Sequence, residues 1–284
     1  MTPPAGPARA NPFFLEAEQG QRFCLYHPPG ATTYRGAVLY IHPFAEEMNK
    51  SRRMAALQAR MLTALGYGVL QLDLYGCGDS SGDFADARWE IWKHDLALAH
   101  RWLEQRLPGP VHLWGLRIGA MLALDYAAGA DAAPASLALW QPPLSGKQFL
   151  TQFLRLRVAN DMLSNNRETG NGTAALRAQL QAGGMLEIAG YDLAPALADA
   201  IDALDLLELR PATGPVHWFE AVAAAGRPLP PGAARVGAAW TDAGVDLRLQ
   251  TVACAPFWST AEVTECPELL AATTAVFSQP RDVR

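Results

Sequence analysis

The feature that most constrains the fold of this chain is a turn between two glycines, Gly115 and Gly119. An expected strand, HLW, leads into the sequence GLRIG, and an apolar helix follows directly. Glycine is needed at both ends of such a turn because the backbones of strand and helix approach too closely for side chains. The turn therefore pushes its middle residue, Arg117, out at the carboxyl edge of a sheet.

Strands and helices alternate along most of the chain, which predicts an α/β fold with a mostly parallel central sheet and helices on both faces. The chain begins with a hairpin around Gly20, and Ser51 is the expected cap of the first helix. The expected strands are 13–18, 22–27, 37–41, 69–74, 112–114, 136–140, 216–221 and 246–252, and the expected helices are 51–65, 87–107, 118–128, 231–241 and 267–277.

The alternation stops between residues 142 and 211, where no strand is expected and glycine-rich turns separate helical stretches. One stretch places Leu193, Leu197 and Ile201 at helical spacing. A helical insertion between two strands of one sheet is typical of a lid or cap. The expected organisation is therefore a disordered start at 1–12, a core formed by 13–141 and 212–284, and a helical lid at 142–211.

Composition excludes several classes of protein. The 284 residues carry a net charge of −5 and half are hydrophobic, so the chain is neither disordered nor a basic nucleic-acid binder. No run of about 18 apolar residues predicts a membrane span, and no signal peptide is expected. The four cysteines lack the spacing of metal or redox motifs, and the sequence holds no phosphate- or dinucleotide-binding motif. We therefore expect a cytoplasmic protein without metal or cofactor.

Arg117 stands where such a turn would expose a nucleophile. A guanidinium stays protonated in proteins and cannot attack a carbonyl carbon. A histidine base is missing as well, because the loop after the last expected strand holds Trp258 in the place where a histidine is expected. The six histidines all lie at or before residue 217: His27, His42, His94, His100, His112 and His217. Ordinary catalysis by a nucleophile and histidine is therefore not expected.

Three glutamates stand where the acid of a catalytic triad is possible. Glu220 ends the strand expected at 216–221, and Glu262 and Glu265 follow the last expected strand. A solvated or salt-bridged glutamate is the more common alternative for each of them.

The loop after strand 37–41 is unusually charged for the rim of a pocket. The backbone N–H of Phe44 or Ala45 would point into the pocket as an oxyanion donor. Glu46 or Glu47 is expected to pair bidentately with Arg117, either as a purely structural pair or as part of a ligand site. His42 is more often a hydrogen-bonded scaffold residue than a base in such a position.

The loop at 73–82 provides the nearest alternative nucleophiles. Cys77, Ser80 and Ser81 belong to it, but no histidine is placed to activate them, and turn capping explains the serines. His94 and His100 are six residues apart on one expected helix, which is not the spacing of a metal site.

Four segments together resemble one family: IHPFAEEMNKSRRM at 41–54, DLYGCGDSSGDF at 73–84, WGLRIGA at 114–120 and APFW at 255–258. They are similar to exosortase A system-associated hydrolases of type 2, which are α/β-hydrolase relatives encoded beside exosortase and exopolysaccharide machinery. The resemblance implies the α/β-hydrolase fold and an ester, thioester or acyl-transfer substrate class. It places Arg117 at the nucleophile position, Ile118 and Phe44 at the oxyanion positions, Glu220 at an acid position and Trp258 near the missing histidine.

Two functions follow as expectations. The first is a hydrolase or acyltransferase with an altered mechanism, in which Arg117 clamps an anionic substrate and Glu46 or Glu47 is the general base. The alternative is a non-catalytic protein that holds a small anionic or acyl ligand through Arg117. The residues expected at this pocket are Arg117, Glu46, Glu47, His42, Cys77 and Trp258; a purely structural role for the turn also remains open.

Overall fold

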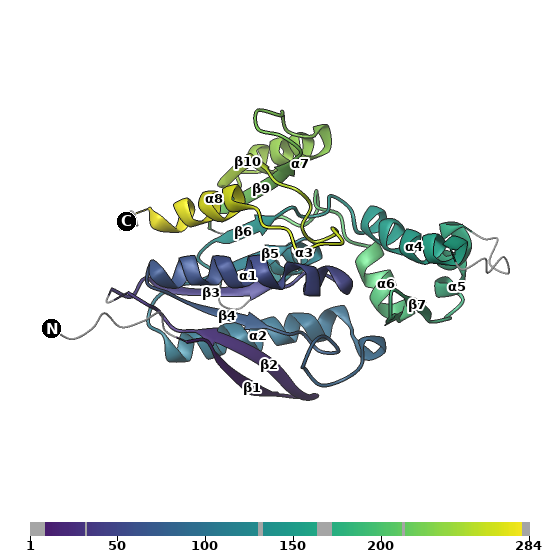
Figure 1. Cartoon of the computed structure of the whole chain (residues 1–284), viewed down its shortest axis with the longest axis horizontal. Coiled ribbons are helices and arrows are strands. Elements are labelled where there is room, and N and C mark those ends of the chain that lie inside the picture. The colour runs from purple at the N-terminus through teal and green to yellow at the C-terminus, as the bar shows by residue number, and fades with distance from the viewer. Residues whose placement is uncertain (1–8, 32, 130–132, 164–171, 212–213, 280–284) are drawn as a thin grey trace.

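The computed structural model describes residues 9–31, 33–129, 133–163, 172–211 and 214–279. Its centre is an eight-stranded sheet with the order β1-β2-β4-β3-β5-β6-β9-β10 (Figure 1). The strands are β1 (Asn11–Ala17), β2 (Gly20–His27), β3 (Gly36–Ile41), β4 (Tyr67–Leu72), β5 (Val111–Leu116), β6 (Leu137–Trp140), β9 (Val216–Val222) and β10 (Leu247–Ala253).

The sheet is parallel except at one edge. The hairpin β1–β2 is antiparallel and joins the rest through an antiparallel β2–β4 pair, whereas β4, β3, β5, β6, β9 and β10 run parallel. The central strand β3 is apolar throughout because both of its faces are covered, and all six of its residues are buried. The carboxyl ends of the parallel strands therefore meet at one edge, which is where Arg117 follows β5.

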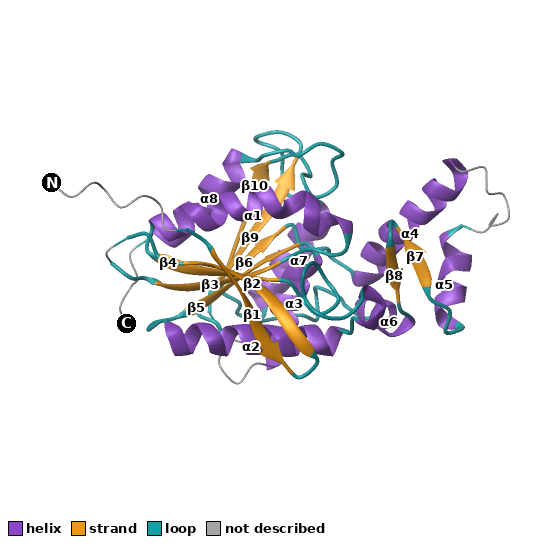
Figure 2. Cartoon of the chain, turned by 60° about the horizontal axis from the view of Figure 1, so that its bottom comes forward, coloured by secondary structure: helices purple, strands orange, loops and turns teal. Residues whose placement is uncertain are grey.

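Helices cover both faces of the sheet, as expected (Figure 2). Helices α1 and α8 pack in one apolar layer, and α2, α3 and α7 pack in the layer on the opposite face. Their bounds are α1 (Glu46–Ala64), α2 (Trp89–Arg106), α3 (Ile118–Gly129), α7 (Pro231–Asp242) and α8 (Pro267–Ser278), with a short 3₁₀ helix, η1 (Phe84–Asp86), before α2.

The segment between β6 and β9 forms a separate group of elements beyond the end of the sheet (Figures 1 and 2). It contains α4 (Gly146–Leu163), α5 (Thr173–Gln181), β7 (Leu186–Ile188), β8 (Tyr191–Leu193) and α6 (Pro195–Asp202). Its description as a lid stays a prediction.

The expectation that this segment holds no strand is wrong, because β7 and β8 form a small antiparallel hairpin. Ala189 and Gly190 both adopt positive φ at its turn, a backbone geometry that matches the twist of a two-residue hairpin. Leu193 therefore lies in β8, while Leu197 and Ile201 lie in α6, and all three are fully buried.

Two expected boundaries also need correction. Helix α1 begins at Glu46 and not at Ser51, which is a fully buried residue inside the helix. The reason is Ala45, whose φ of 49° turns the chain sharply into the helix directly after β3 and its short loop. At the N-terminus, β1 already includes Asn11 and Pro12, so that part of the segment expected to be disordered is a strand; residues 1–8 lie outside the described residues.

Within the described residues, no helix is both long enough and apolar enough to cross a membrane.

Candidate functional site

The turn after β5 has the geometry that its sequence predicts. Arg117 adopts a φ of 56° in the left-handed region, and its N–H donates to the Trp140 carbonyl at 2.9 Å. A Cβ on Gly119 would lie 2.5 Å from the His42 carbonyl oxygen, and one on Gly115 would lie 2.5 Å from the Gly119 oxygen. Both glycines are therefore required by close packing, and the strained residue between them is held at the carboxyl edge of the sheet.

The Arg117 side chain is partly buried and incompletely paired. Only 13% of it is exposed, and its Nε lies 3.3 Å from Oε1 of Glu47. The guanidinium carbon lies 5.7 Å from the ring centre of Phe149 and 5.4 Å from that of Trp258, within the range of cation–π attraction. Among the described residues, no other hydrogen bond to this guanidinium is present, so Nη1 and Nη2 have no protein acceptor.

The guanidinium faces a cavity of about 320 Å³ between the carboxyl edge of the sheet and helix α4. One part of the lining is charged, and the other is aromatic or aliphatic. The lining residues are Phe44, Glu46, Glu47, Arg117, Phe149, Gln152, Phe153, Leu156, Trp258 and Ser259. The cavity therefore combines charged and polar groups with an apolar wall, a composition that suits a small ligand with both kinds of group.

The structure confirms Glu47, one of the two expected glutamates, as the carboxylate partner of Arg117, but the expected bidentate geometry is wrong. Only Oε1 of Glu47 contacts Arg117, and Oε2 of each glutamate is buried without a hydrogen-bond partner. Because α1 begins at Glu46, successive side chains point about 100° apart around the helix, and only Glu47 reaches Arg117.

Burial sets the protonation of these two glutamates. It raises the pKa of Glu47 to about 7, although the neighbouring Arg117 opposes the shift. Burial also raises the pKa of Glu46, against the pull of a backbone hydrogen bond and of Lys50. Near neutral pH, Glu47 is therefore able to exchange a proton at the wall of the cavity.

The two expected oxyanion residues occupy different surroundings. Phe44 lines the cavity, and its ring centre lies 5.0 Å from that of Phe153 and 5.6 Å from that of Phe149. Ile118 is the buried first residue of α3 and does not line the cavity. The loop and turn hydrogen bonds of the described residues use neither the Phe44 nor the Ile118 N–H, so an oxyanion role for these groups remains a prediction.

His42 is held by the backbone on both sides of its ring. Its Nδ1 lies 2.7 Å from the Pro43 carbonyl, and its Nε2 accepts from the Leu74 N–H at 3.2 Å. Burial lowers the pKa of this imidazole. His42 thus joins two loops as a neutral ring and does not line the cavity.

Glu220 is neither solvated nor salt-bridged, so the more common alternative expected for this glutamate is wrong. It is buried in β9, where it accepts hydrogen bonds from Gln141 at 3.0 Å and from the Trp218 indole at 2.9 Å. Burial raises its pKa, while these two bonds and the charge of Arg117 oppose the shift. It does not line the cavity, and a role as triad acid remains a prediction.

The structure does not bring Cys77 to the cavity, contrary to expectation. Its thiol is buried, and burial together with Asp73 raises its pKa, so it stays protonated. Ser80 accepts from the Phe23 N–H and donates to the Asp73 carbonyl, and Ser81 accepts from the Gln21 N–H. Both serines therefore attach the loop at 73–82 to strand β2.

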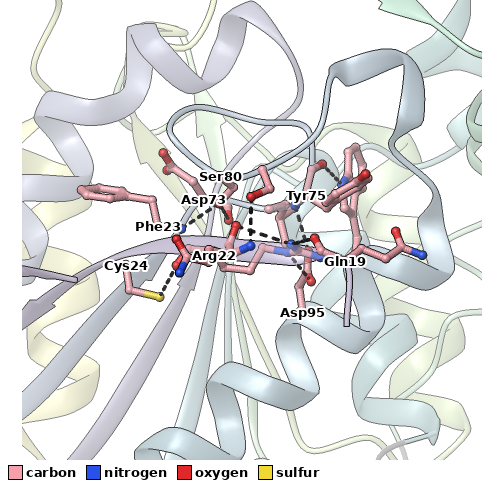
Figure 3. A network of polar contacts seen from close by, with 12 residues as sticks. Gln19, Arg22, Phe23, Cys24, Asp73, Tyr75, Ser80 and Asp95 are labelled. Atoms are coloured by element: carbon pink, nitrogen blue, oxygen red, sulfur yellow. Dashed lines mark hydrogen bonds and ion pairs between the residues drawn. The ribbon is translucent and has the colours of Figure 1, made fainter. Parts of the chain in front are cut away.

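The sequence interpretation missed a buried ion pair under the N-terminal hairpin (Figure 3). Arg22 Nε lies 2.6 Å from Oδ1 of Asp95, and both side chains are 2% exposed. The guanidinium also donates to the Gln19 carbonyl, and Oδ2 of Asp95 accepts from the Tyr75 N–H. One signal for it was present, because Arg22 shares the inward face of β2 with Cys24.

Comparisons with known proteins agree on the fold. No family model matches the chain. It is similar in structure to Est1E of Butyrivibrio proteoclasticus with bound ferulic acid, at a TM-score of 0.63, 14% identity and coverage of 94% of this chain and 96% of that one. A soluble variant of the monoglyceride lipase of Saccharomyces cerevisiae, in complex with a substrate analogue, also gives a TM-score of 0.63, at 16% identity and 94% coverage of both chains. The chain therefore has the α/β-hydrolase fold.

A sequence relative matches only a part of the chain. The lysophosphatidylserine lipase ABHD12 of Danio rerio is 26% identical over 132 residues, which is 40% of this chain. The matching segment spans a third of that lipase, 33% of its length.

Proposed function

We propose that this protein binds a small ligand that carries an anionic group and an apolar body, with Arg117 as the anion-binding residue. The observation that carries the proposal is a largely buried guanidinium, 13% exposed, that belongs to a cavity-lining residue and whose two terminal nitrogens have no acceptor among the described residues. Buried charged donors are almost always satisfied in folded proteins. A carboxylate or phosphate is the acceptor that the planar fork of an arginine fits best.

The walls of the cavity favour an apolar body on this ligand. Phe149, Phe153 and Leu156 of α4 line the cavity, and the rings of Phe149 and Trp258 both lie within cation–π range of the guanidinium. Covering this surface gains free energy at about 25 cal/mol per Å² of apolar area, which orients the ligand with its charge toward Arg117.

The similar proteins suggest a first probe. Est1E binds ferulic acid, an aromatic carboxylic acid, and the other two relatives are lipases. We carry over only the shared chemistry, an acid or acyl group attached to an apolar body. Ferulate and 3-phenylpropanoate meet this description, and each has an uncharged methyl ester as its control.

Isothermal titration calorimetry tests the proposal with these four compounds. The two acids are expected to bind, and their methyl esters are expected to bind at least tenfold more weakly because they cannot form the fork with Arg117. Arg117→Met removes the charge and is expected to abolish the preference for the acids. Equal binding of acids and esters, or an unchanged preference in Arg117→Met, would show that Arg117 is not the anion site.

Hydrolysis is a second candidate, which the protonation of Glu47 favours. A carboxyl group with a pKa near 7 beside a cavity is suited to activate water, and Arg117 would stabilise the developing negative charge. Under this proposal, short p-nitrophenyl esters are turned over, Glu47→Gln abolishes the reaction, and a fluorophosphonate probe does not label the protein. Labelling of a serine, or turnover that survives Glu47→Gln, would contradict it.

An association with the exosortase and exopolysaccharide system, and a cytoplasmic location, are further proposals that rest on the sequence alone. The first is supported by the four segments that resemble the type 2 hydrolases, two of which, at 41–54 and 114–120, supply Glu47 and Arg117. Deletion of the gene in its host is expected to lower secreted polysaccharide. Normal secretion in the deletion strain would remove the support for this association.

A further inference from the structure

The loop that carries Trp258 has a cysteine at each end. Cys254 directly follows the last residue of β10, and Cys266 directly precedes the first residue of α8. Both cysteines are buried in the apolar layer that contains α1 and α8, where they are 8% and 2% exposed. Neither belongs to the lining of the Arg117 cavity, so the proposed binding of an anion uses neither thiol.

The fold brings these two thiols together. A hydrogen bond joins the side chains of Cys254 and Cys266. The Cys266 Sγ also lies 3.6 Å from the carbonyl oxygen of Ala253, the residue directly before Cys254. The Cys254 Sγ lies 3.3 Å from the carbonyl oxygen of Ala255. Both sulfur atoms therefore lie against the same short stretch of backbone, where a small shift of the two side chains is enough to join them.

Cys266 is the more acidic of the two thiols. It is the cap residue of α8, where the backbone N–H groups of Glu268 and Leu269 stabilise a thiolate. The hydrogen bond from Cys254 and these N–H groups lower the pKa of Cys266, against the effect of burial and of the Glu268 carboxylate. The same hydrogen bond, together with burial, raises the pKa of Cys254. Cys266 is thus the thiol that ionises, and Cys254 lies beside it as the second thiol.

We propose that Cys254 and Cys266 are a modification site, at which hydrogen peroxide converts the two thiols to a disulfide. The Cys266 thiolate attacks one peroxide oxygen and becomes a sulfenic acid, while the O–O bond breaks and the other oxygen takes up a proton and leaves as water. The Cys254 sulfur then bonds to the Cys266 sulfur, and the sulfenic hydroxyl leaves with the Cys254 proton as a second water. The two thiols lose two electrons, which the peroxide gains.

The disulfide ties together the two ends of the loop that contributes Trp258 and Ser259 to the cavity. Such a cross-link removes conformations from the unfolded chain, so oxidation is expected to stabilise the protein and to confine this loop. The burial of both thiols favours a small oxidant, because a water-sized peroxide reaches a buried sulfur more easily than a peptide disulfide does.

Mass spectrometry of the unmodified protein tests the inference. After treatment with hydrogen peroxide at neutral pH, the remaining thiols are alkylated in urea and the chain is cut with trypsin. One tryptic peptide holds both cysteines, because no lysine or arginine lies between Arg248 and Arg281. This peptide is expected to be unalkylated and lighter by two hydrogen atoms, and to take up two alkyl groups after reduction with dithiothreitol.

Cys24 and Cys77 are controls within the same chain. Burial raises the pKa of both thiols, with Asp73 adding to the shift, so they stay protonated and are expected to remain fully alkylated. Alkylation of all four cysteines after peroxide would overturn the inference. A disulfide that includes Cys24 or Cys77, or further oxidation of Cys266 without a disulfide, would overturn it as well.

Single variants separate the two roles. In Cys254→Ala, the sulfenic acid of Cys266 has no partner and is expected to be trapped by dimedone, whereas Cys254 in Cys266→Ala is expected to be labelled at least about tenfold more slowly. Equal labelling of the two variants would overturn the assignment of Cys266 as the attacking thiol. Oxidation is expected to raise the melting temperature of the unmodified protein by several degrees and that of neither variant. A disulfide that leaves this temperature unchanged would show that the bond does not restrain the loop.

Discussion

Two buried arginine–carboxylate pairs in this molecule differ in how completely they are satisfied. Under the hairpin, Arg22 Nε and Asp95 Oδ1 lie 2.6 Å apart, Arg22 Nη1 also donates to the Gln19 carbonyl, and Asp95 Oδ2 accepts from the Tyr75 N–H. At the carboxyl edge of the sheet, Arg117 and Glu47 share one contact of 3.3 Å, and atoms on both sides remain unused. We call Arg22–Asp95 the complete pair, because both oxygens of its carboxylate are hydrogen-bonded within the protein, and Arg117–Glu47 the incomplete pair, because Oε2 of Glu47 has no partner among the described residues.

Their chemistry differs in the same way. Burial raises the pKa of Asp95, while the hydrogen bond from the Tyr75 N–H and the charge of Arg22 oppose the shift. Glu47 has a pKa near 7 and takes up a proton when its environment changes. The complete pair therefore serves stability, and the incomplete pair is suited to respond to a ligand.

The largest expected effect is the loss of the complete pair. Asp95→Leu leaves the Arg22 charge buried without a counterion, and the free energy of unfolding is expected to fall by about 3–5 kcal/mol. Urea unfolding followed by circular dichroism measures it. Glu90→Leu, at a side chain that is 70% exposed on the same helix, is the control and is expected to change stability by less than about 0.5 kcal/mol. A loss below about 1 kcal/mol in Asp95→Leu would show that the Arg22–Asp95 pair does not stabilise the fold.

The next effect concerns the turn that presents Arg117. Gly119→Ala places a Cβ 2.5 Å from two backbone oxygens, those of Ile41 and His42, and is expected to cost about 1–3 kcal/mol or more. Gly129→Ala, at the end of the same helix with no atom within 4 Å, is the matched control. It is expected to be neutral or stabilising because alanine favours a helix. Thermal unfolding of both variants tests this, and equal melting temperatures would contradict it.

The incomplete pair is expected to contribute little to stability. In Arg117→Met, the Glu47 left behind becomes neutral by binding a proton, so the free energy of unfolding at pH 6 is expected to fall by less than about 1 kcal/mol. The same urea experiment measures it. If Arg117→Met were as destabilising as Asp95→Leu, both pairs would be structural.

The smallest expected effect is on the pH dependence of ligand binding. Glu47 is protonated below pH 7, which removes a negative charge beside the incoming anion, so 3-phenylpropanoate is expected to bind severalfold more tightly at pH 6 than at pH 8. Glu46, Lys50 and Arg117 are the other charged groups that act on Glu47. Calorimetry at both pH values is expected to give a flat profile for Glu47→Gln. A slope that persists in that variant would assign the pH dependence to another group.

The sequence predicted the elements of the core because each carries a local signal. The two glycines around Arg117 and the apolar run of β3 require a particular backbone or a buried position, and both predictions are confirmed by the sheet and the turn. The β7–β8 hairpin was not predicted, because its strands have three residues each and are too short to show an alternating pattern in the sequence.

The site was less predictable than the fold because it depends on contacts between distant residues. Which of Glu46 and Glu47 points toward Arg117 depends on where α1 begins, because the start of a helix sets the direction of each side chain. The start at Glu46 was not predicted. Arg22 and Asp95 are 73 positions apart and carry no common motif. Only the packing of hairpin, loop and helix brings them together.

A crystal structure of the protein with bound 3-phenylpropanoate would show whether Arg117 holds the anion. We expect the carboxylate of this acid within hydrogen-bond distance of Nη1 and Nη2 of Arg117, with its phenyl ring against Phe149 and Trp258. A map that shows both nitrogens bonded to protein groups, with the acid elsewhere, would contradict it.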